Sequence, residues 1–219
     1  FFAIVSERGE EAAELLKTVV DKLPGVEMRD LCYNGFMSMV RKNEEKAADR
    51  LNSASTLLGV SLEQLCKDSF FSIVETHGVE AATARIKACL AAINAGVAAD
   101  KKITIERVVK CDSFLSIINR RDDAASLILS CLSQINGGVA VNEQASVGKF
   151  GDSSFSIINE QQHAAGPRIR SVIDAFGLSP VKACNHGSFF SFVKDTENAT
   201  KIGEKIVSAG VNVSQIYSG

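Results

Sequence analysis

A short apolar run with a central small residue recurs six times, and its spacing is the strongest pattern in the chain. The five full copies are Gly35–Val40, Ser69–Val74, Ser113–Ile118, Ser153–Ile158 and Ser188–Val193, and a shortened copy stands at Phe1–Val5. The central positions, which are Ala3, Ser38, Ser72, Ser116, Ser156 and Ser191, are 35, 34, 44, 40 and 35 residues apart. Such a period indicates one supersecondary unit copied along the chain.

Each run is followed by a segment with helical periodicity. In the second copy the apolar positions Ala47, Leu51, Ala54 and Leu58 recur at three- and four-residue intervals, which predicts one buried helix stripe. A glycine stands just past each predicted helix, where a left-handed cap is favoured: Gly25, Gly59, Gly96, Gly137, Gly177 and Gly210. We therefore expect a helix in every copy.

The apolar runs themselves are short, which favours strands over helices. A second strand is predicted after each helix, at Val26–Cys32, Val60–Cys66, Ile103–Cys111, Val139–Val147, Leu178–Cys184 and Val211–Tyr217. Turn-forming residues join each of these to the next apolar run, which predicts hairpins. Two strand–helix–strand units joined by a hairpin make βαββαβ, so the predicted fold class is α+β, with tandem ferredoxin-like domains whose antiparallel sheets carry helices on one face. We expect three domains, at 1–67, 68–150 and 151–219.

Alternation along these predicted strands places an aromatic side chain on the sheet face away from the helices. The residues in question are Phe36, Phe70, Phe114 and Phe189. Exposing several of them to water would be costly, so this face is expected to be an interface. Two alternatives stay open: the domains bury these faces against each other within one chain, or the faces pack against neighbouring chains.

Three segments resemble ACT domains, in particular those in the regulatory half of aspartokinases. They are Val181–Lys201, Val74–Ala82 and Ala209–Ile216. The resemblance implies a ferredoxin-like (ACT-like) fold and an amino-acid site near His77, Gly78, Val79 and Asn212. The chain departs from the family pattern because it has no Asp-x-x-Gly element after Val5 or Ile158, and it contains no kinase-like half.

Composition narrows the function classes. The net charge is −2, so nucleic acid is not expected as a partner. The apolar runs are far shorter than a membrane helix, so no membrane insertion is expected. Six cysteines without a Cys-x-x-Cys pair indicate a reducing compartment, such as the cytoplasm or an organelle matrix or stroma. Because Phe1 opens the chain within a predicted strand, we expect an upstream segment, which could include a targeting peptide.

Candidate chemistry is sparse. The histidines His77, His163 and His186 lie in different predicted loops without a second ligand at a metal-binding spacing, so neither a metal nor another cofactor is expected. Cysteines recur at the end of the second predicted strand, at Cys32, Cys66, Cys111 and Cys184. Their repetition favours small buried packing residues, and a redox or metal cluster is the alternative. The recurrent serine is interpreted as a packing spacer, because all five full copies carry it.

These observations predict a protein that is not an enzyme. The first hypothesis is a structural or assembly protein whose repeated modules self-associate or dock onto a larger complex, as a shell, lattice or scaffold subunit. The alternative is an ACT-type allosteric sensor that binds an amino acid or a similar small metabolite and regulates a partner enzyme.

Overall fold

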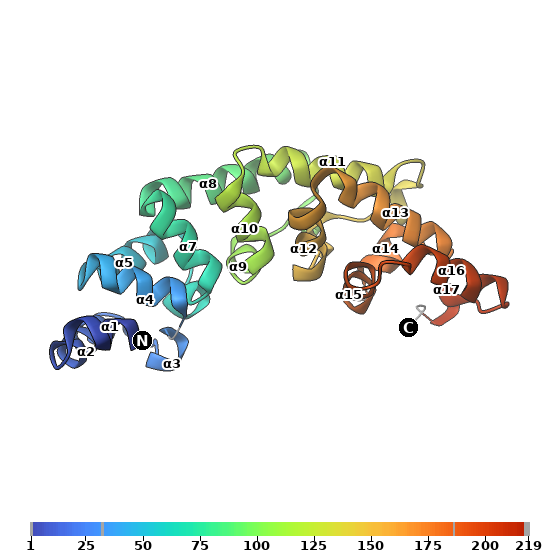
Figure 1. The fold of residues 1–219 in the computed structure, drawn as a ribbon. Coiled ribbons are helices and arrows are strands. Elements are labelled where there is room, and N and C mark those ends of the chain that lie inside the picture. Colours follow the sequence, from blue (N-terminus) through green and yellow to red (C-terminus); the bar gives the residue numbers. More distant parts are fainter. Residues whose placement is uncertain (1, 32, 186, 217–219) are drawn as a thin grey trace. The chain divides into compact units, whose positions relative to one another are not determined.

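The computed structural model describes residues 2–31, 33–185 and 187–216, and within these ranges it contains helices and no strand (Figure 1). The predicted α+β fold with ferredoxin-like, ACT-like domains and antiparallel sheets is therefore wrong. The resemblance to ACT domains falls with it, since that family is defined by a sheet. Predictions that involve Phe1, Cys32, His186 and Tyr217 lie outside the described residues.

Each repeat contains two main helices, and most repeats add a short third helix. The first helices, which contain the recurrent apolar run, are α1 (Phe2–Arg8), α4 (Asn34–Asn43), α7 (Asp68–His77), α10 (Asp112–Arg120), α12 (Asp152–Gln161) and α15 (Gly187–Asp195). The second helices are α2 (Glu11–Asp21), α5 (Lys46–Leu58), α8 (Val79–Ile93), α11 (Ala124–Asn136), α13 (Ala165–Ala175) and α16 (Ala199–Ser208). The short third helices are α3 (Met28–Leu31), α6 (Leu62–Leu65), α9 (Ile105–Val109), α14 (Pro180–Cys184) and α17 (Val213–Ile216). Single 3-10 turns occur at η1 (Ala99–Lys101), η2 (Val141–Glu143), η3 (Val147–Lys149) and η4 (Gln162–Ala164).

The recurrent run is the buried stripe of a helix, as the third copy shows. Phe70, Phe71, Ile73 and Val74 are all 0% exposed, whereas Ser72 between them is half-buried. Positions i, i+1, i+3 and i+4 share one side of a helix, but a strand would divide them between its two faces. The pattern of two apolar residues, a serine and two apolar residues therefore fits a single buried helix face.

The second predicted strands are instead turns that lead into short capped helices. Before α6, the Ser61 Oγ accepts a hydrogen bond from the Gln64 backbone N–H (3.3 Å), and the Gln64 side chain accepts one from the Ser61 backbone N–H (3.0 Å). This reciprocal capping box fixes a helix start. Thr104 similarly caps α9, and Pro180 stands in the first turn of α14.

The predicted second helices are confirmed. In α8 the sequence pattern predicts a buried stripe of Ala82, Ile86, Cys89, Leu90 and Ile93; four of these residues are buried, at 0–7% exposed, and Leu90 is half-buried. Gly59 ends α5 in the left-handed conformation, with φ of +70°, as the cap requires.

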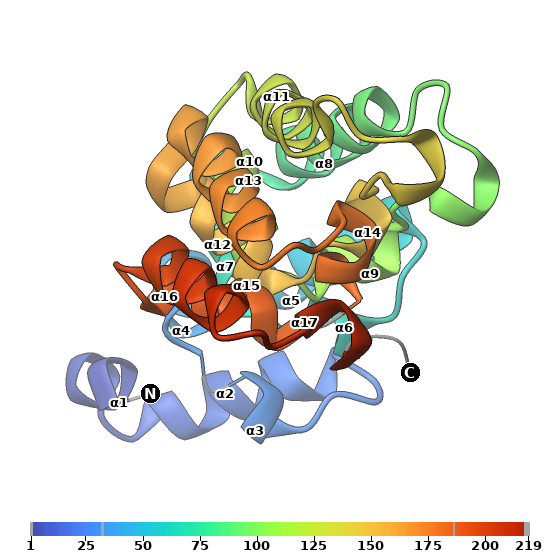
Figure 2. The same ribbon diagram turned by 90° about the vertical axis from the view of Figure 1, so that its right-hand side faces the viewer.

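The described chain divides into two compact units. Unit 1 contains residues 1–89 and 104–121, and unit 2 contains residues 90–103 and 122–219. In unit 1, α4 packs against α7 and α7 against α10 (Figure 1). In unit 2, α11 packs against α13, α13 against α16, and α12 against α15 (Figure 2). The described residues of the ranges 1–67, 68–150 and 151–219 form helical repeats, so none of these ranges is a ferredoxin-like domain.

Each unit has its own aromatic core. In unit 1 the Phe36 and Phe71 ring centroids are 5.1 Å apart. In unit 2 the Phe150 ring lies 5.8 Å from that of Phe155 and 5.7 Å from that of Phe190. Burial of each such side chain contributes roughly 1.5–3 kcal/mol, so these rings hold successive first helices together.

Among the described residues, no single helix has the length and apolar character needed to cross a membrane; α11 together with residues Val141–Lys149 meets both criteria only as a pair bent by 115°.

Candidate functional site

The first helices turn a polar edge away from their buried stripes, and we call this edge the serine seam. It consists of Ser38, Ser69, Ser72 and Ser116 in unit 1, and of Ser153, Ser156 and Ser191 in unit 2. Ser156 is buried and the other six serines are half-buried. They stand at the gap in each apolar run or three residues before it, which places them on one side of each helix.

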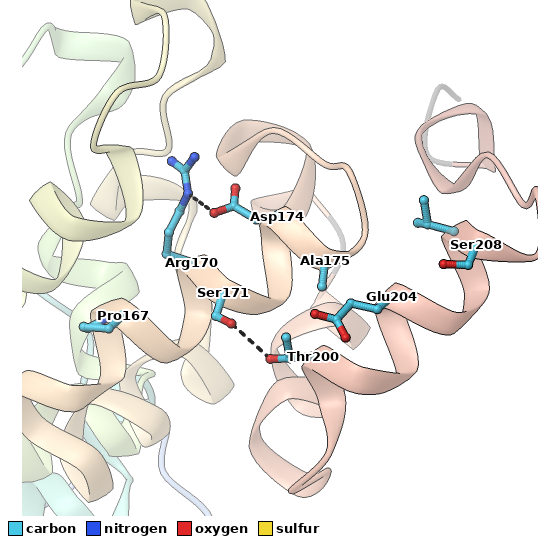
Figure 3. A pocket seen from close by; sticks show the side chains of 9 residues that line it. Pro167, Arg170, Ser171, Asp174, Ala175, Thr200, Glu204 and Ser208 are labelled. Carbon is cyan, nitrogen blue, oxygen red and sulfur yellow. Dashed lines mark hydrogen bonds and ion pairs between the residues drawn. The ribbon is translucent and has the colours of Figure 1, made fainter.

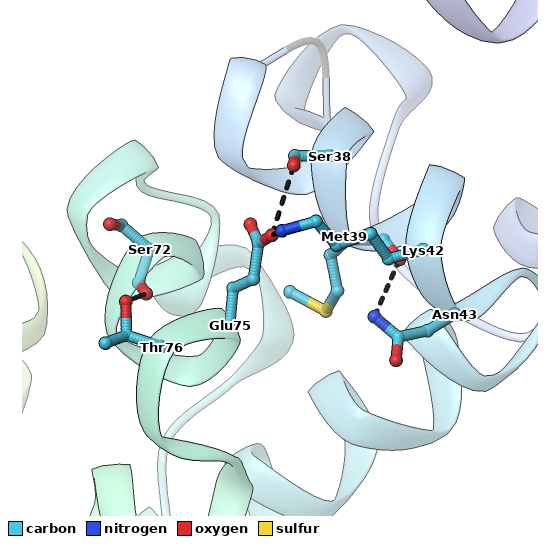
Figure 4. Close-up of polar contacts among 7 residues, drawn as sticks. All are labelled: Ser38, Met39, Lys42, Asn43, Ser72, Glu75 and Thr76. Carbon is cyan, nitrogen blue, oxygen red and sulfur yellow. Dashed lines mark hydrogen bonds and ion pairs between the residues drawn. The ribbon is translucent and has the colours of Figure 1, made fainter.

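At the boundary between α4 and α7, two side chains converge on one carboxylate oxygen (Figure 4). The Ser38 hydroxyl donates to Glu75 Oε1 over 3.2 Å, and Lys42 forms an ion pair with the same oxygen. Glu75 lies three residues after Ser72 and is largely shielded from water. A charge-assisted contact of this kind fixes the register between two neighbouring helices.

Between α7 and α10, a polar residue three positions after the recurrent serine again contacts the serine of the preceding repeat. Asn119, three residues after Ser116, donates through Nδ2 to the Ser72 hydroxyl over 3.3 Å. The Ser69 and Ser116 hydroxyls are 3.3 Å apart. Each serine is therefore a hydrogen-bonding group between repeats as well as a small packing residue.

Unit 2 repeats this arrangement between α12 and α15. The Ser153 and Ser191 hydroxyls are 3.0 Å apart, and Lys194 Nζ lies 3.5 Å from Glu160 Oε1. The Ser156 hydroxyl donates to the same Glu160 oxygen over 2.9 Å. The seam thus carries paired charges of both signs, so it has no strong field of either sign.

Aspartates at the starts of the first helices add a second contact between repeats. Asp68 accepts a hydrogen bond from the Gly35 backbone N–H (2.7 Å), and Asp112 accepts one from the Ser69 backbone N–H (3.3 Å). N–H groups in a first helical turn lack partners within the helix, so a carboxylate from the next repeat satisfies them.

At the C-terminal ends of the first helices, two arginines make a further contact between helices. Arg85 Nη2 donates to the carbonyl oxygens of Ile118 (2.9 Å) and Arg121 (3.1 Å). Arg168, at the corresponding position of unit 2, donates to those of Val193 (2.7 Å) and Thr196 (3.3 Å). Carbonyl groups at a helix C-terminus attract cations, so both guanidinium groups hold a neighbouring repeat in place.

The residues implied by the ACT resemblance do not form one site within either unit. His77 ends α7, and its Nε2 lies 3.1 Å from the Asn119 carbonyl oxygen. Gly78 is the cap of that helix, and Val79 is a buried first residue of α8. Asn212 belongs to unit 2, where its Oδ1 accepts a hydrogen bond from Ser214 over 3.1 Å.

The four phenylalanines expected at an interface lie in the core. Phe36, Phe70, Phe114 and Phe189 are 0–5% exposed. Helical geometry places them on the same stripe as the apolar residues that were assigned to the opposite face. Their burial is therefore satisfied by neighbouring helices of the same chain.

The cysteines within the described residues behave as packing residues. Burial raises the pKa values of the Cys66, Cys89 and Cys184 thiols to about 12 and also raises that of Cys131. At neutral pH these thiols are protonated, and a protonated thiol is a poor nucleophile and a poor metal ligand. No group of three or more His, Cys, Asp or Glu side chains is placed to hold a metal among the described residues.

A groove of about 750 Å³ runs along α13 and α16, and four of its polar side chains, Arg170, Asp174, Ser171 and Thr200, already have partners (Figure 3). Arg170 Nε donates to Asp174 over 2.8 Å, and the Ser171 and Thr200 hydroxyls are 3.2 Å apart. Arg170 also donates to the carbonyl oxygen of Ile135 over 3.1 Å. These contacts join neighbouring second helices, so the groove is part of the packing between repeats.

Glu75, Asn119 and Glu160 contact the serine seam, and sequence reasoning missed all three. The available signal was a polar residue three or four positions after each recurrent serine, as in Ser72–Glu75 and Ser116–Asn119. If the apolar runs are strands, these polar positions lie beyond the strand and have no fixed relation to the serine. In a helix they lie on the same side as the serine.

Comparison with known proteins gives no relationship from which to infer function: no family model, no curated protein and no solved structure matches this chain.

Proposed function

We propose that this chain is a non-catalytic docking component, in which stacked helical repeats present the serine seam to a partner protein. The observation that carries the proposal is the seam itself. Equivalent polar side chains follow one another across neighbouring first helices, and hydrogen bonds between repeats fix their register. Helical repeats arranged in this way commonly supply extended binding surfaces.

The chemistry of the seam favours a protein as the partner. Lys42 pairs with Glu75 and Lys194 pairs with Glu160, so the seam offers hydroxyl, amide and paired charged groups in close succession. A polyphosphate backbone would need clustered unpaired cations, and the net charge of the chain is −2. A second copy of this chain or a subunit of a larger complex both meet this description.

The absence of an enzyme activity is part of the proposal. Catalytic groups need tuned proton affinities and convergent geometry. Here burial raises the pKa of the Cys184 thiol, and every seam serine except Ser156 bonds to a group of a neighbouring repeat. Among the described residues there is no sheet face to form an interface, so the proposed docking rests on helix faces.

Site-specific photo-crosslinking tests this proposal. A chain with a photoreactive amino acid in place of Ser116 on the seam should form one discrete cross-linked product in an extract of its native cells. The cross-linked partner should be either a second copy of the chain or one subunit of a larger complex. The same amino acid at exposed Lys87 on α8 is the matched control and should form none. Adding Glu75→Lys should abolish the Ser116 adduct, because it reverses a seam charge.

Sedimentation of the purified chain at several concentrations shows whether the partner is a second copy of the chain. A dimer that dissociates in the Glu75→Lys variant supports a second copy as the partner, and a monomer that cross-links to one other subunit supports a larger complex. Equal adducts from Ser116 and Lys87, or adducts that survive Glu75→Lys, would contradict docking at the seam.

A further inference from the structure

The two longest repeats carry extra segments that are built in the same way. Asn94 directly follows α8. Its Nδ2 donates a hydrogen bond to the Ile103 carbonyl oxygen (2.8 Å), and its Oδ1 accepts one from the Ile103 backbone N–H (3.0 Å). Asn136 holds Ala145 by the same pair of bonds, at 3.0 Å and 2.8 Å. Each asparagine therefore holds both backbone groups of the residue nine positions further along the chain and so clamps a loop of eight intervening residues. Loops that a rigid scaffold holds in place often carry binding residues.

Within unit 2, the first clamped loop meets the segment that directly follows the second. The turns η1 and η3 are in contact, and a Cβ atom at Gly148 would lie only 2.6 Å from the Lys101 carbonyl oxygen. Only glycine permits this close approach between backbones. Gln144 stiffens the second loop by donating to the Val139 carbonyl oxygen over 3.0 Å.

Together with α11, these loops line a partly open cavity of about 430 Å³, which we call the loop cavity. Its walls include the apolar side chains of Ile93, Val97, Leu129, Leu132 and Val147. Val141 also lines it and is 75% exposed, an unusual position for an apolar side chain unless it contacts something. The volume lies within the range of small-molecule sites, which are about 300–1,000 Å³.

The charged groups of the loop cavity are Lys101, Lys149 and Asp100, so its lining has an excess of positive charge. Neither lysine forms an ion pair with any residue that the structure describes. The asparagine amides are already committed to the loop backbone. Asn142 and Ser146 also line the cavity, but only the two lysines carry a positive charge, so recognition of an anionic group falls mainly to them.

From this geometry we propose that the loop cavity binds a small carboxylate with an apolar body, whose hydrocarbon part packs on the apolar walls and whose carboxylate pairs with Lys101 and Lys149. This ligand site is separate from the serine seam, and it does not depend on docking there.

Titration calorimetry and two-dimensional NMR with sodium octanoate test the proposal, with octylammonium and 1-octanol as probes of equal chain length. Octanoate should bind saturably with one molecule per chain and about tenfold more tightly than octylammonium, since the lysines attract one head group and repel the other. The largest chemical-shift changes should fall within residues 93–103 and 136–149.

Variants locate the contacts. Lys101→Gln combined with Lys149→Gln should weaken octanoate binding about tenfold and leave 1-octanol binding unchanged. Val141→Asp should abolish octanoate binding, and its solvent-exposed site allows the fold to persist, which circular dichroism can check. Lys102→Gln combined with Lys201→Gln removes two exposed charges outside the cavity lining and is the matched control.

Three results would overturn the proposal. The first is the absence of saturable octanoate binding at millimolar concentration. The second is equal affinity for octanoate and octylammonium. The third is an equal loss of octanoate binding in the control pair and in the cavity pair.

Discussion

Burial determines what each cysteine can do. Cys184 is 8% exposed, and burial is the main reason that its thiol pKa rises to about 12, although nearby Lys149 acts in the opposite direction. The sequence repeats cysteine at the ends of the second predicted strands, which predicts small packing residues there. Burial of Cys66, Cys111 and Cys184 confirms that part of the interpretation.

Unfolding should therefore depend on pH in the alkaline range. Below about pH 9 the Cys184 thiol is protonated in both states, so it adds no pH dependence. Above this pH the unfolded thiol loses its proton first, while the folded pKa is about 12, so the free energy of unfolding falls as pH rises. Between about pH 9 and about pH 10 the loss is about 1 kcal/mol for this thiol.

Urea denaturation under reducing conditions measures this loss. Cys184→Ala should reduce the decrease between those two pH values by about 1 kcal/mol. Identical pH slopes in wild type and Cys184→Ala would show that this thiol does not titrate as its burial implies.

At the scale of elements, the short apolar runs are the segments whose secondary structure was predicted wrongly, as strands in place of helices. The second helices were predictable because stripes such as Ala82–Ile93 extend over three turns, which a strand cannot imitate. The run Phe70–Val74 covers little more than one turn, and both periods can be read into it. The residues on either side of the run distinguish the two. Asp68 begins the helix, and the polar residue Glu75 lies on the same side of the helix as Ser72.

The short third helices were missed for a different reason. Their apolar content resembles a strand, but Ser61 and Gln64 form a capping box that is already visible as Ser-x-x-Gln in the sequence. Ser179–Pro180 gives a similar signal at α14. Of the candidate site, the recurrent serines were visible as a pattern, whereas their partners depend on helix packing between repeats.

The helix assignment predicts equal roles for Phe70 and Phe71. Both are 0% exposed on one stripe of α7, so replacing either with Ala should lower the free energy of unfolding by roughly 3–5 kcal/mol. Ser72→Ala is the matched control, and it should cost only about 1 kcal/mol because a single hydrogen bond is lost. Chemical denaturation followed by circular dichroism measures all three. A large loss for Phe71→Ala with none for Phe70→Ala would restore the alternation expected of a strand.

At the scale of the whole molecule, repeats contact mainly their neighbours, so stability is expected to be local. The two units have separate aromatic cores, at Phe36 and Phe71 in unit 1 and at Phe150 and Phe190 in unit 2. Each unit also contains a glycine at a tight contact between neighbouring repeats. These glycines allow the two units to be perturbed separately.

Gly35→Ala and Gly166→Ala should therefore weaken different parts of the chain. A Cβ at Gly35 would lie 2.9 Å from Phe71 Cβ and 3.0 Å from the Asp68 carbonyl oxygen, and one at Gly166 would lie 3.1 Å from Cys131 Cα. Both are closer than ordinary contacts, so each substitution should push two helices apart at a cost of about 1–3 kcal/mol. In hydrogen exchange, Gly35→Ala should speed exchange in α4 and α7 while α11 and α13 keep their protection, and Gly166→Ala should do the reverse. Equal acceleration in both units by either variant would mean that the chain opens as one cooperative body and that its stability is not local to the repeats.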